Sequence, residues 1–574
     1  MDPTPQQIDQ IFSEWDHTNT PGCALAVIRA GHILYKRGYG MANLELGVPI
    51  RPESIFDIGS VSKQFTAMSV VLLARQGVLS LDDEIQKYLP EIPFIGHKIT
   101  IRHFLNHTSG MRDYLGLMFL AGMPLENDYQ EQEVIELIAR QKELNFIPGS
   151  EYLYSNSGYF LLAEIVQRVS GKNLRDFAEE NIFKPLGMTH THFHNNFREV
   201  VPNRASAYSP SEKDCGGYSI DMGIFDVTGD GAVYTSVEDL YLWDQNFYHN
   251  VLGGGGSVHS RQIPGVVTWN GYSPGRTSEH SGCTCPEPGR CCPEQELIEL
   301  METTAVLNNG EAIDYACGLR VSTQRGLKVV RHGGSWYGYH AEFLQFPEQQ
   351  FSVICLSNLG TMDPGLLAGR VADLFLGDKY TETEPPGVST GFIQLADNLL
   401  REKCGFYLSD ETGDLIELFL KDGKLCTDLR GNTIPLEAVS ATHFVDAGGM
   451  AGFEVRFEEP VSTQRRIIHV DINHGYLKET MHSLEPVSLT PGQRQAYAGK
   501  YYSPELEIMY SIAEKEDKLM VSFKNFPADE LKPAGKELFK GTHFSLEFLP
   551  DAEGKPGAFQ IHAGRVKNIH FECR

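Results

Sequence analysis

Residues 327–358, LKVVRHGGSWYGYHAEFLQFPEQQFSVICLSN, contain three short apolar runs, each of the length of a β-strand. Residues 365–375, GLLAGRVADLF, follow with the apolar spacing of a helix. Near the other end, residues 3–16 have the pattern of an amphipathic helix, and residues 23–40 that of a hairpin turning at Ala30-Gly31. The order of helix, strands, long helical middle, strands and helix predicts an α+β domain. In it, an antiparallel sheet is flanked by the terminal helices and carries an inserted helical subdomain.

The sequence after residue 391 reads as one all-β unit that occurs twice. Three short motifs recur in the same order: Gly405-Phe406-Tyr407 with Gly499-Lys500-Tyr501, Lys424-Leu425 with Lys518-Leu519, and Thr442-His443-Phe444 with Thr542-His543-Phe544. Small all-β modules leave no exposed strand edge when their sheet closes, so we predict that each copy is a β-barrel. The alternative to a repeat is chance similarity. Pro- and Gly-rich stretches mark the boundaries. The predicted domains are 1–376, then a linker at 377–391, and modules at 392–487 and 488–574.

The composition excludes several classes of protein. Of 574 residues, 41% are hydrophobic and 22% charged, as in ordinary globular proteins. The chain has 49 basic and 75 acidic residues, so its net charge is −26. We therefore expect neither nucleic acid nor a membrane as partner. The longest apolar stretch, Ala67–Leu79, is too short to span a bilayer, and no signal peptide is visible. Most of the 11 cysteines stand alone in apolar surroundings, which indicates a cytoplasmic protein.

A serine and a lysine stand at the start of an apolar helix predicted for residues 60–80, SVSKQFTAMSVVLLARQGVLS. Ser60 and Lys63 are three residues apart and therefore share a helix face. The helix start directs backbone N–H groups towards Ser60, and a neutral Lys63 amine could take the serine proton. S-x-x-K alone is common, and the alternative is an N-cap serine followed by a solvated lysine. The apolar character of this helix disfavours that alternative.

A tyrosine and an asparagine precede a second apolar helix, which ends at Gly171. Tyr154 and Asn156 can thus be held at a rigid loop-to-helix junction facing a cleft. The same letters occur at Tyr248 and Asn250, but there they end a helix and run into a glycine-rich stretch. The alternative for Tyr154 is a packed aromatic ring whose hydroxyl is hydrogen-bonded.

His332 and Gly334 end one of the predicted strands, where glycines allow a ligand to approach the backbone closely. H-x-G also occurs at His280, in a Gly/Cys-rich loop, and at His562, in a repeat module. Only His332 ends a strand in the domain that holds Ser60. For His332 alone, a turn histidine would be the simpler interpretation.

Taken together, the three motifs and the stretches FDIGSVSKQFTA (56–67), LNHTSGM (105–111) and TGDGAVYTSVEDL (228–240) resemble the penicillin-recognising serine hydrolases. This group contains class C β-lactamases, low-molecular-weight penicillin-binding proteins, related esterases and D-aminopeptidases. The resemblance spans about residues 6–376 and implies the same sheet and helical subdomain. It also implies an acyl-enzyme mechanism that uses no metal or other cofactor.

The resemblance assigns roles to the motif residues. Ser60 would be the nucleophile, Lys63 and Tyr154 would share general acid and base work, and Asn156 would hold Lys63 and a substrate amide. The backbone N–H groups of Ser60 and Ser335 would form the oxyanion hole. His332, Gly334 and Ser335 would line the substrate site.

His332 stands where β-lactamases usually carry the lysine of K-T-G. Histidine is mostly neutral near pH 7, so it grips a β-lactam carboxylate less well than lysine does. With two predicted barrels after the catalytic domain, the chain most resembles the D-aminopeptidases, in which a loop of the last barrel contacts the substrate amine. Asp529 and Glu530 are acidic candidates for that contact, and a solvated hairpin is the alternative.

Four cysteines cluster in a stretch from about residue 253 to 294: Cys283, Cys285, Cys291 and Cys292. Their spacing matches no zinc pattern that is typical of proteins, so a flexible inserted loop is favoured over a metal site. Structural disulfides are the alternative if the protein is exported.

We therefore predict a serine hydrolase that cleaves an amide bond in a small peptide or amino-acid amide. A carboxylesterase with the same machinery is one alternative, and a non-catalytic penicillin-binding sensor or scaffold is another. The joint presence of Ser60, Lys63, Tyr154 and Asn156 argues against the sensor. A homodimer is compatible with the sequence.

Overall fold

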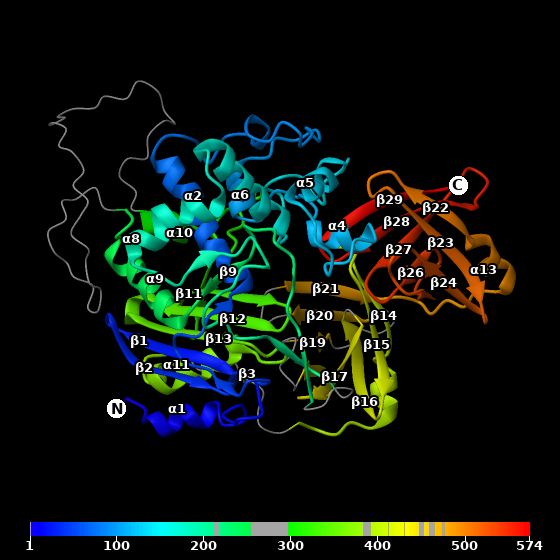
Figure 1. The fold of residues 1–574 in the computed structure, drawn as a ribbon. Coiled ribbons are helices and arrows are strands. Elements are labelled where there is room, and N and C mark those ends of the chain that lie inside the picture. The colour runs from blue at the N-terminus through cyan, green and yellow to red at the C-terminus, as the bar shows by residue number, and fades with distance from the viewer. Residues whose placement is uncertain are drawn as a thin grey trace. The chain divides into compact units, whose positions relative to one another are not determined.

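The computed structural model describes most of the chain (Figure 1), namely residues 2–211, 217–253, 297–382, 392–410, 412–429, 431–446, 453–458, 465–472 and 477–574. The predicted cysteine cluster, Cys283, Cys285, Cys291 and Cys292, lies outside these residues. The chain divides into two compact units, and each is assembled from separate stretches of sequence. The first unit comprises residues 1–90, 98–109 and 158–381, and the second comprises residues 91–97, 110–157 and 382–574.

A six-stranded antiparallel sheet forms the centre of the first unit, in the order β10-β11-β12-β13-β1-β2. Its strands are β1 (Cys23–Arg29), β2 (His32–Tyr39), β10 (Arg320–Gln324), β11 (Leu327–Trp336), β12 (Tyr339–Phe346) and β13 (Phe351–Ser357). Ala30 and Gly31 turn the β1–β2 hairpin with φ of 49° and 78°. The predicted strands, hairpin and antiparallel sheet are confirmed.

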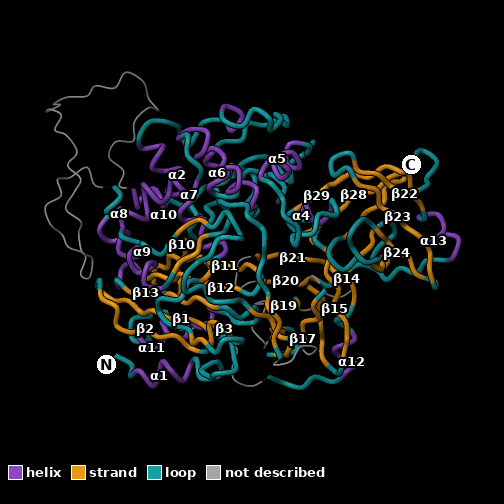
Figure 2. Tube along the Cα trace, in the orientation of Figure 1, coloured by secondary structure: helices purple, strands orange, loops and turns teal. Residues whose placement is uncertain are grey.

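Helices cover both faces of this sheet (Figure 2). On one face, α1 (Pro5–Ile11) and α11 (Pro364–Leu376) bury their apolar sides against alternate residues of β1, β12 and β13. On the other face, α9 (Val237–His249) packs on β1 and β13. Asp244 of α9 accepts hydrogen bonds from Gln345 and Ser352 of the sheet, at 2.7 and 2.6 Å.

The remaining helices of the first unit form the predicted helical subdomain around α2 (Lys63–Arg75). They are η1 (Gly59–Ser62), η2 (Ile85–Lys87), α3 (Ile101–Leu105), α6 (Asn156–Ser170), α7 (Leu174–Ala178), η3 (Glu179–Phe183), α8 (Lys184–Leu186) and α10 (Leu297–Glu302). A further short helix, η4 (Pro347–Gln349), connects β12 and β13 of the sheet. Short strands complete the unit: β3 (Met41–Asn43), β4 (Val48–Pro49), β5 (Phe56–Asp57), β6 (His192–Phe193), β7 (Tyr208–Pro210), β8 (Tyr218–Ile220) and β9 (Val233–Thr235). The small sheet β5-β9-β6 leads directly into the turn that carries Ser60.

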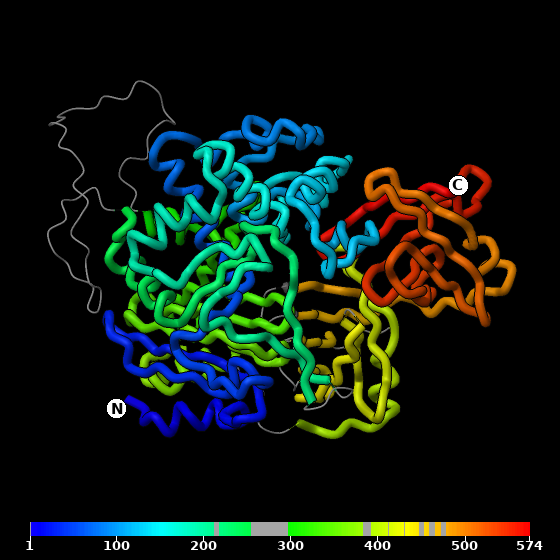
Figure 3. Tube along the Cα trace, viewed as in Figure 1, coloured from blue at the N-terminus to red at the C-terminus, as the bar shows by residue number. Residues whose placement is uncertain are grey.

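Two closed eight-stranded barrels make up most of the second unit, as predicted (Figure 3). The first contains β14 (Gly405–Ser409), β15 (Leu415–Lys421), β16 (Lys424–Leu429), β17 (Asn432–Ala438), β18 (His443–Asp446), β19 (Glu454–Phe457), β20 (Ile467–Ile472) and β21 (Leu477–Ser483). The second contains β22 (Gly499–Ser503), β23 (Ile508–Lys515), β24 (Lys518–Ser522), β25 (Asp529–Pro533), β26 (Leu538–Lys540), β27 (Ser545–Pro550), β28 (Pro556–Ala563) and β29 (Val566–Cys573). Short helices precede the barrels, α12 (Asp397–Arg401) and α13 (Pro491–Tyr497).

Residues 110–157, with α4 (Tyr114–Leu120) and α5 (Glu131–Ala139), pack against the last barrel. The ring of Phe119 lies edge-on to those of Phe523 and Phe526, with centroids 5.9 and 4.7 Å away. The hydroxyl of Tyr510 donates to the carbonyl of Leu120 at 2.9 Å. Figure 1 shows α4, in cyan, beside β28 and β29, in red. No pattern in the sequence predicted this contact.

Within the described residues, no helix combines the length and apolar character needed to cross a bilayer.

Candidate active site

The turn that carries Ser60 is held rigidly between β5 and α2. Gly59 has φ of +49°, which favours glycine, and its N–H donates to the buried carboxyl of Asp57 at 2.8 Å. Burial raises the pKa of Asp57 to about 7. On the other side, the hydroxyl of Ser62 accepts the N–H of Val233 in β9 at 3.0 Å. Ser60 itself is half-buried.

Lys63 lies one turn further along and touches Ser60. Its Nζ is 3.1 Å from the Ser60 hydroxyl oxygen, and the side chain is completely buried. The same Nζ donates to the carbonyl of Asp230 at 2.6 Å and lies 5.6 Å from the ring centroid of Tyr159. The two predicted residues are thus within proton-transfer distance of each other.

The end of β11 passes directly over this turn. A Cβ atom on Gly334 would lie 1.9 Å from the carbonyl oxygen of Ile58 and 3.1 Å from the nitrogen of Ser60. A Cβ on Gly59 would lie 2.6 Å from the nitrogen of Ser335. Only glycine fits at these two positions. The structure therefore brings Gly334 and the exposed Ser335 against the turn that carries Ser60.

His332 is buried in the same strand, with 4% of its surface exposed. Its Nδ1 is 2.7 Å from the carbonyl of Gly333, which can only accept, so Nδ1 carries the proton. Its Nε2 therefore accepts the hydroxyl of Tyr315, at 2.8 Å. Burial, with the positive charge of Lys63 as the next cause, lowers the pKa of His332 to about 3. His332 is thus neutral, and it faces protein groups rather than open surface.

Asn156 is the first residue of α6 and Tyr154 lies two residues before it; both are buried and belong to the second unit. The carboxylate of Asp113 fixes this start. Its Oδ2 accepts the N–H of Asn156 at 2.7 Å, and its Oδ1 accepts those of Leu115 and Gly116 at the start of α4. One carboxylate therefore caps two helices, and it holds the Tyr154–Asn156 segment in place.

The turn between β28 and β29 contacts this segment. The carbonyl of Arg565 accepts the N–H of Asp113 at 3.2 Å and the side-chain amide of Asn145 at 2.9 Å. The guanidinium of Arg565 lies 4.7 Å from the ring centroid of Tyr154. This turn contains Gly564, from the H-x-G match at His562 that the sequence analysis set aside because it lies in a repeat module.

Arg112, the residue before Asp113, also binds the β28–β29 hairpin. Its buried guanidinium binds the carboxylate of Glu505 at 2.6 Å and the carbonyls of Lys567 and Asn568 at 2.9 and 2.8 Å. The sequence analysis missed Arg112, Asp113 and Arg565, because single charged residues in loops carry no pattern.

Asp529 and Glu530, the acidic candidates in the last barrel, have partners in that barrel. Asp529 accepts the N–H and hydroxyl of Thr542 at 2.7 and 2.6 Å, and Glu530 pairs with Lys518 at 2.7 Å. The hairpin that contacts Tyr154 is a different one, and it presents a cation.

Tyr248, the second match to Y-x-N, lies in the last turn of α9. Asn250 ends that helix in the left-handed conformation, with φ of 45°. Burial raises the pKa of Tyr248 well above its ordinary value. This environment suits a packed ring rather than a proton carrier.

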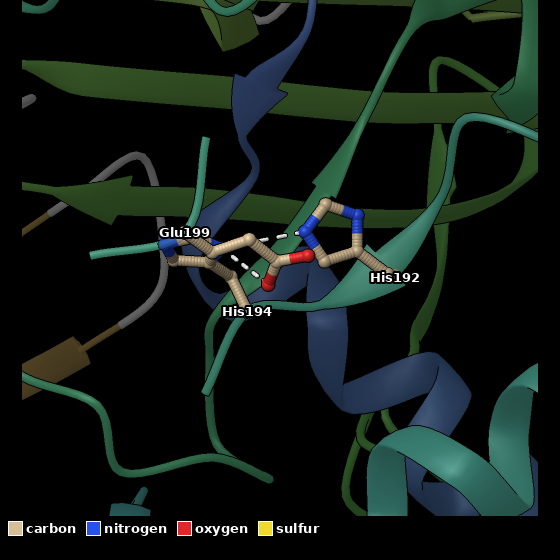
Figure 4. A group of neighbouring side chains, drawn as sticks. All are labelled: His192, His194 and Glu199. Atoms are coloured by element: carbon tan, nitrogen blue, oxygen red, sulfur yellow. Dashed lines mark hydrogen bonds and ion pairs between the residues drawn. The ribbon is translucent and has the colours of Figure 1, made fainter. Parts of the chain in front are cut away.

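One group within the described residues has the composition of a metal site: His192, His194 and Glu199 (Figure 4). The facing ring nitrogens of the two histidines lie 3.3 Å apart. Both oxygens of Glu199, however, bind the guanidinium of Arg175, at 2.5 and 2.8 Å. Burial lowers the pKa of His194 to about 4, so the imidazole is neutral. Glu199 is thus already paired with Arg175, and an enzyme that needs no metal remains our prediction.

Comparisons with known proteins place this geometry in a family. The family model described as Beta-lactamase matches residues 8–281. Penicillin-binding protein 4* of Bacillus subtilis (strain 168) is 30% identical over 354 residues, which are 59% of this chain and 68% of that protein. The chain belongs to the β-lactamase family.

The similarity extends beyond the segment that the β-lactamase family model matches. A D-aminopeptidase of Brucella anthropi is 25% identical over 525 residues, covering 89% of this chain and 84% of that protein. The solved structure of an octameric penicillin-binding protein homologue from Pyrococcus abyssi has a TM-score of 0.53 at 24% identity. It covers 83% of this chain and 98% of the other, which supports the shared fold. As a member of the β-lactamase family the protein is a serine-type hydrolase, as the sequence predicted.

Proposed function

We propose that the protein is an amidase or peptidase of D-aminopeptidase type, with Ser60 as nucleophile. The observation that carries this proposal is the 3.1 Å contact between the Ser60 hydroxyl and the completely buried amine of Lys63. The D-aminopeptidase named above is similar over most of this chain, including the region of the barrels. The proposed substrate is a small peptide or an amino-acid amide.

In the proposed mechanism, Ser60 Oγ attacks the carbonyl carbon of the scissile amide. Lys63 and Tyr154 share the proton that Ser60 loses and pass it to the nitrogen of the leaving amine as the C–N bond breaks. Water then attacks the acyl-enzyme ester, with the same groups taking its proton and returning one to Ser60. The N–H groups of Ser60 and Ser335 would stabilise the oxyanion, and each such donor is typically worth about 10²–10³ in rate.

The resemblance to the penicillin-recognising serine hydrolases supports a shared role for Asn156 and Lys63. The ring of Tyr159 packs on the amine of Lys63. In the proposal, Asn156 orients Lys63 and the substrate amide. Tyr154, which lies two residues before the helix, takes part in proton transfer.

The state of His332 favours amides over β-lactams as substrates. A histidine with a pKa of about 3 is neutral at working pH. In the proposal, His332 and Gly334 line the substrate site without offering a fixed charge to a β-lactam carboxylate.

We also propose a cytoplasmic location and a catalytic domain at residues 1–376 with barrel modules at 392–487 and 488–574. The six cysteines in the described part of the chain are free thiols, which supports a reducing compartment. A homodimer remains compatible with the proposal.

The test is detection of an acyl-enzyme by intact mass, after exposure to D- and L-peptide amides, p-nitrophenyl esters and penicillins. We expect an adduct with D-amides in the wild-type protein and none in Ser60→Ala. Adducts and turnover with esters alone would favour the carboxylesterase. Adducts with penicillins alone, without turnover, would favour the penicillin-binding sensor.

A further inference from the structure

The β28–β29 turn is fixed to the segment of Tyr154 through its main chain. The carbonyl of Arg565 takes two hydrogen bonds, from Asp113 and Asn145, and the N–H of Lys567 donates to Asn145 at 2.9 Å. None of these bonds uses the side chain of Arg565. The guanidinium is thus presented by a turn whose position does not depend on it.

The guanidinium of Arg565 lies over the face of the Tyr154 ring, 4.7 Å from its centroid, and about one third of the side chain is exposed. A cation is attracted to a neutral tyrosine ring, and more strongly to a phenolate, which carries a full negative charge. The cation therefore stabilises the phenolate relative to the phenol.

Other charged groups lie around this pair. Asp113 is 3.9 Å from Arg565, but its two oxygens also accept N–H groups from the starts of α4 and α6, which offset its charge. His562, on the same hairpin, is neutral because burial, followed by the charges of Lys567 and Arg112, lowers its pKa to about 4. Lys567, like Arg112, is a cation, and Arg112 is paired with Glu505.

We propose that Arg565 is a positioning residue that favours the phenolate of Tyr154, so that the last barrel sets the protonation state of Tyr154. This inference rests on the proposed role of Tyr154 in proton transfer. The proton that Tyr154 loses goes to solvent, and Tyr154 then accepts the proton released by Ser60 and delivers it to the leaving amine.

The test compares the pH dependence of kcat/KM in full-length wild-type protein, Arg565→Gln and Arg565→Lys. Glutamine removes the charge but leaves the main-chain bonds of the turn. We expect the acid limb to move to higher pH by about one unit or more in Arg565→Gln, since an opposite charge this close shifts an ionisation by that amount. Arg565→Lys should keep the wild-type acid limb, because it keeps the charge.

Arg494→Gln is the matched control, since Arg494 lies in α13, just before the same barrel, and pairs with Glu514 and Asp517 of that barrel. Its profile should match the wild type. A uniform loss of activity in Arg565→Gln at every pH, or an unchanged profile, would overturn the inference.

A second readout separates this inference from the proposed function. The near-ultraviolet absorbance of tyrosinate, taken as the difference between each protein and its Tyr154→Phe counterpart, follows Tyr154 without substrate. In Arg565→Gln, the tyrosinate absorbance should appear at a higher pH than in the wild type. Its appearance at the same pH would contradict the inference. If Tyr154→Phe remained fully active, the proposed role of Tyr154 would fail, while the absorbance would still show whether Arg565 controls its ionisation.

Discussion

At the scale of single residues, the proposed chemistry depends on groups that are unusual in their burial. Lys63 is completely buried, yet its amine touches the hydroxyl of the half-buried Ser60. Burial disfavours the charged form of an amine. A general base must be neutral before it can accept the proton of a serine. The amine also contacts the ring of Tyr159 and the carbonyl of Asp230, and the nearby His332 is neutral.

The first prediction at this scale concerns Ser60. Ser60→Ala should abolish turnover of peptide amides with little loss of stability, because only the nucleophilic oxygen is removed. Ser69→Ala is the control, since Ser69 is a buried serine of the same helix whose hydroxyl bonds only to the carbonyl of Phe65. If Ser60→Ala retained a tenth of wild-type kcat, a difference of about 1.4 kcal/mol, the nucleophile would be wrongly assigned.

The second prediction compares two tyrosines. Tyr154→Phe should lose kcat severely, because it removes the proposed proton carrier, whereas Tyr248→Phe should not. Both variants delete one buried hydroxyl, so they are matched in kind. Purified proteins are compared by kcat on one peptide amide. A larger effect at Tyr248 would show that the wrong Y-x-N had been chosen.

At the scale of elements, the capping of helix N-termini holds the Tyr154–Asn156 segment in place. Asp113 caps α4 and α6 together, so its loss should disturb both helices and the Tyr154–Asn156 segment. Asp363 is the matched control, because it caps α11 alone through the N–H of Leu366 at 2.9 Å. Asp363→Ala should cost about 0.5–2 kcal/mol of stability with kcat retained. Asp113→Ala should cost more and should also lower kcat, as measured by thermal unfolding and steady-state kinetics. Equal effects of the two variants on kcat would contradict a positioning role for Asp113.

A further prediction at this scale concerns β6 and the group of His192, His194 and Glu199. Because Glu199 already binds Arg175 through both oxygens, removal of metal should change nothing. Dialysis against EDTA should leave hydrolysis intact, since a serine nucleophile needs no metal-bound water. A loss of activity that Zn²⁺ restores would instead identify a functional metal, and His192→Ala would then show whether this group holds it.

Much of the fold was predictable because periodic patterns report local structure. The alternation in residues 327–358 predicted β11 to β13, and the 3.6 period after Ser60 predicted α2. The pairing of Ser60 and Lys63 followed from the same period. The contact between Arg565 and Tyr154 was not predictable, since it joins residues from distant parts of the chain through a turn with no periodic signal. The H-x-G match in that turn was dismissed on its sequence context alone.

At the scale of the whole molecule, the second unit depends on a buried ion pair between Arg112 and Glu505. Breaking one side of such a pair leaves an uncompensated buried charge, which typically costs about 3–5 kcal/mol. A chain truncated near Leu376 would lose Glu505 and leave Arg112 without this partner. Point variants in the full-length protein therefore test the role of the last barrel more cleanly than truncation does.

The prediction at this scale is made for that pair. Arg112→Met and Glu505→Gln should each destabilise the protein strongly and lower kcat, because both loosen the hairpin beside Tyr154. The double variant should be less destabilised than the sum of the single ones, since neither buried charge remains. Arg494→Met and Glu514→Gln, a more exposed pair that joins α13 to the same barrel, should show small and additive effects. Strict additivity at Arg112 and Glu505 would show that the two groups are not coupled.

Arg112 and Glu505 are 393 residues apart in the chain. A ribosome that adds about 5–20 residues per second needs roughly 20–80 seconds to travel from one to the other. During that interval the nucleophile turn has already emerged, but the segment with Tyr154 still lacks the hairpin that fixes it. An unfinished chain therefore carries Ser60 while the Tyr154 segment still lacks this hairpin, and by the proposed function we expect it to be inactive until the last barrel is complete.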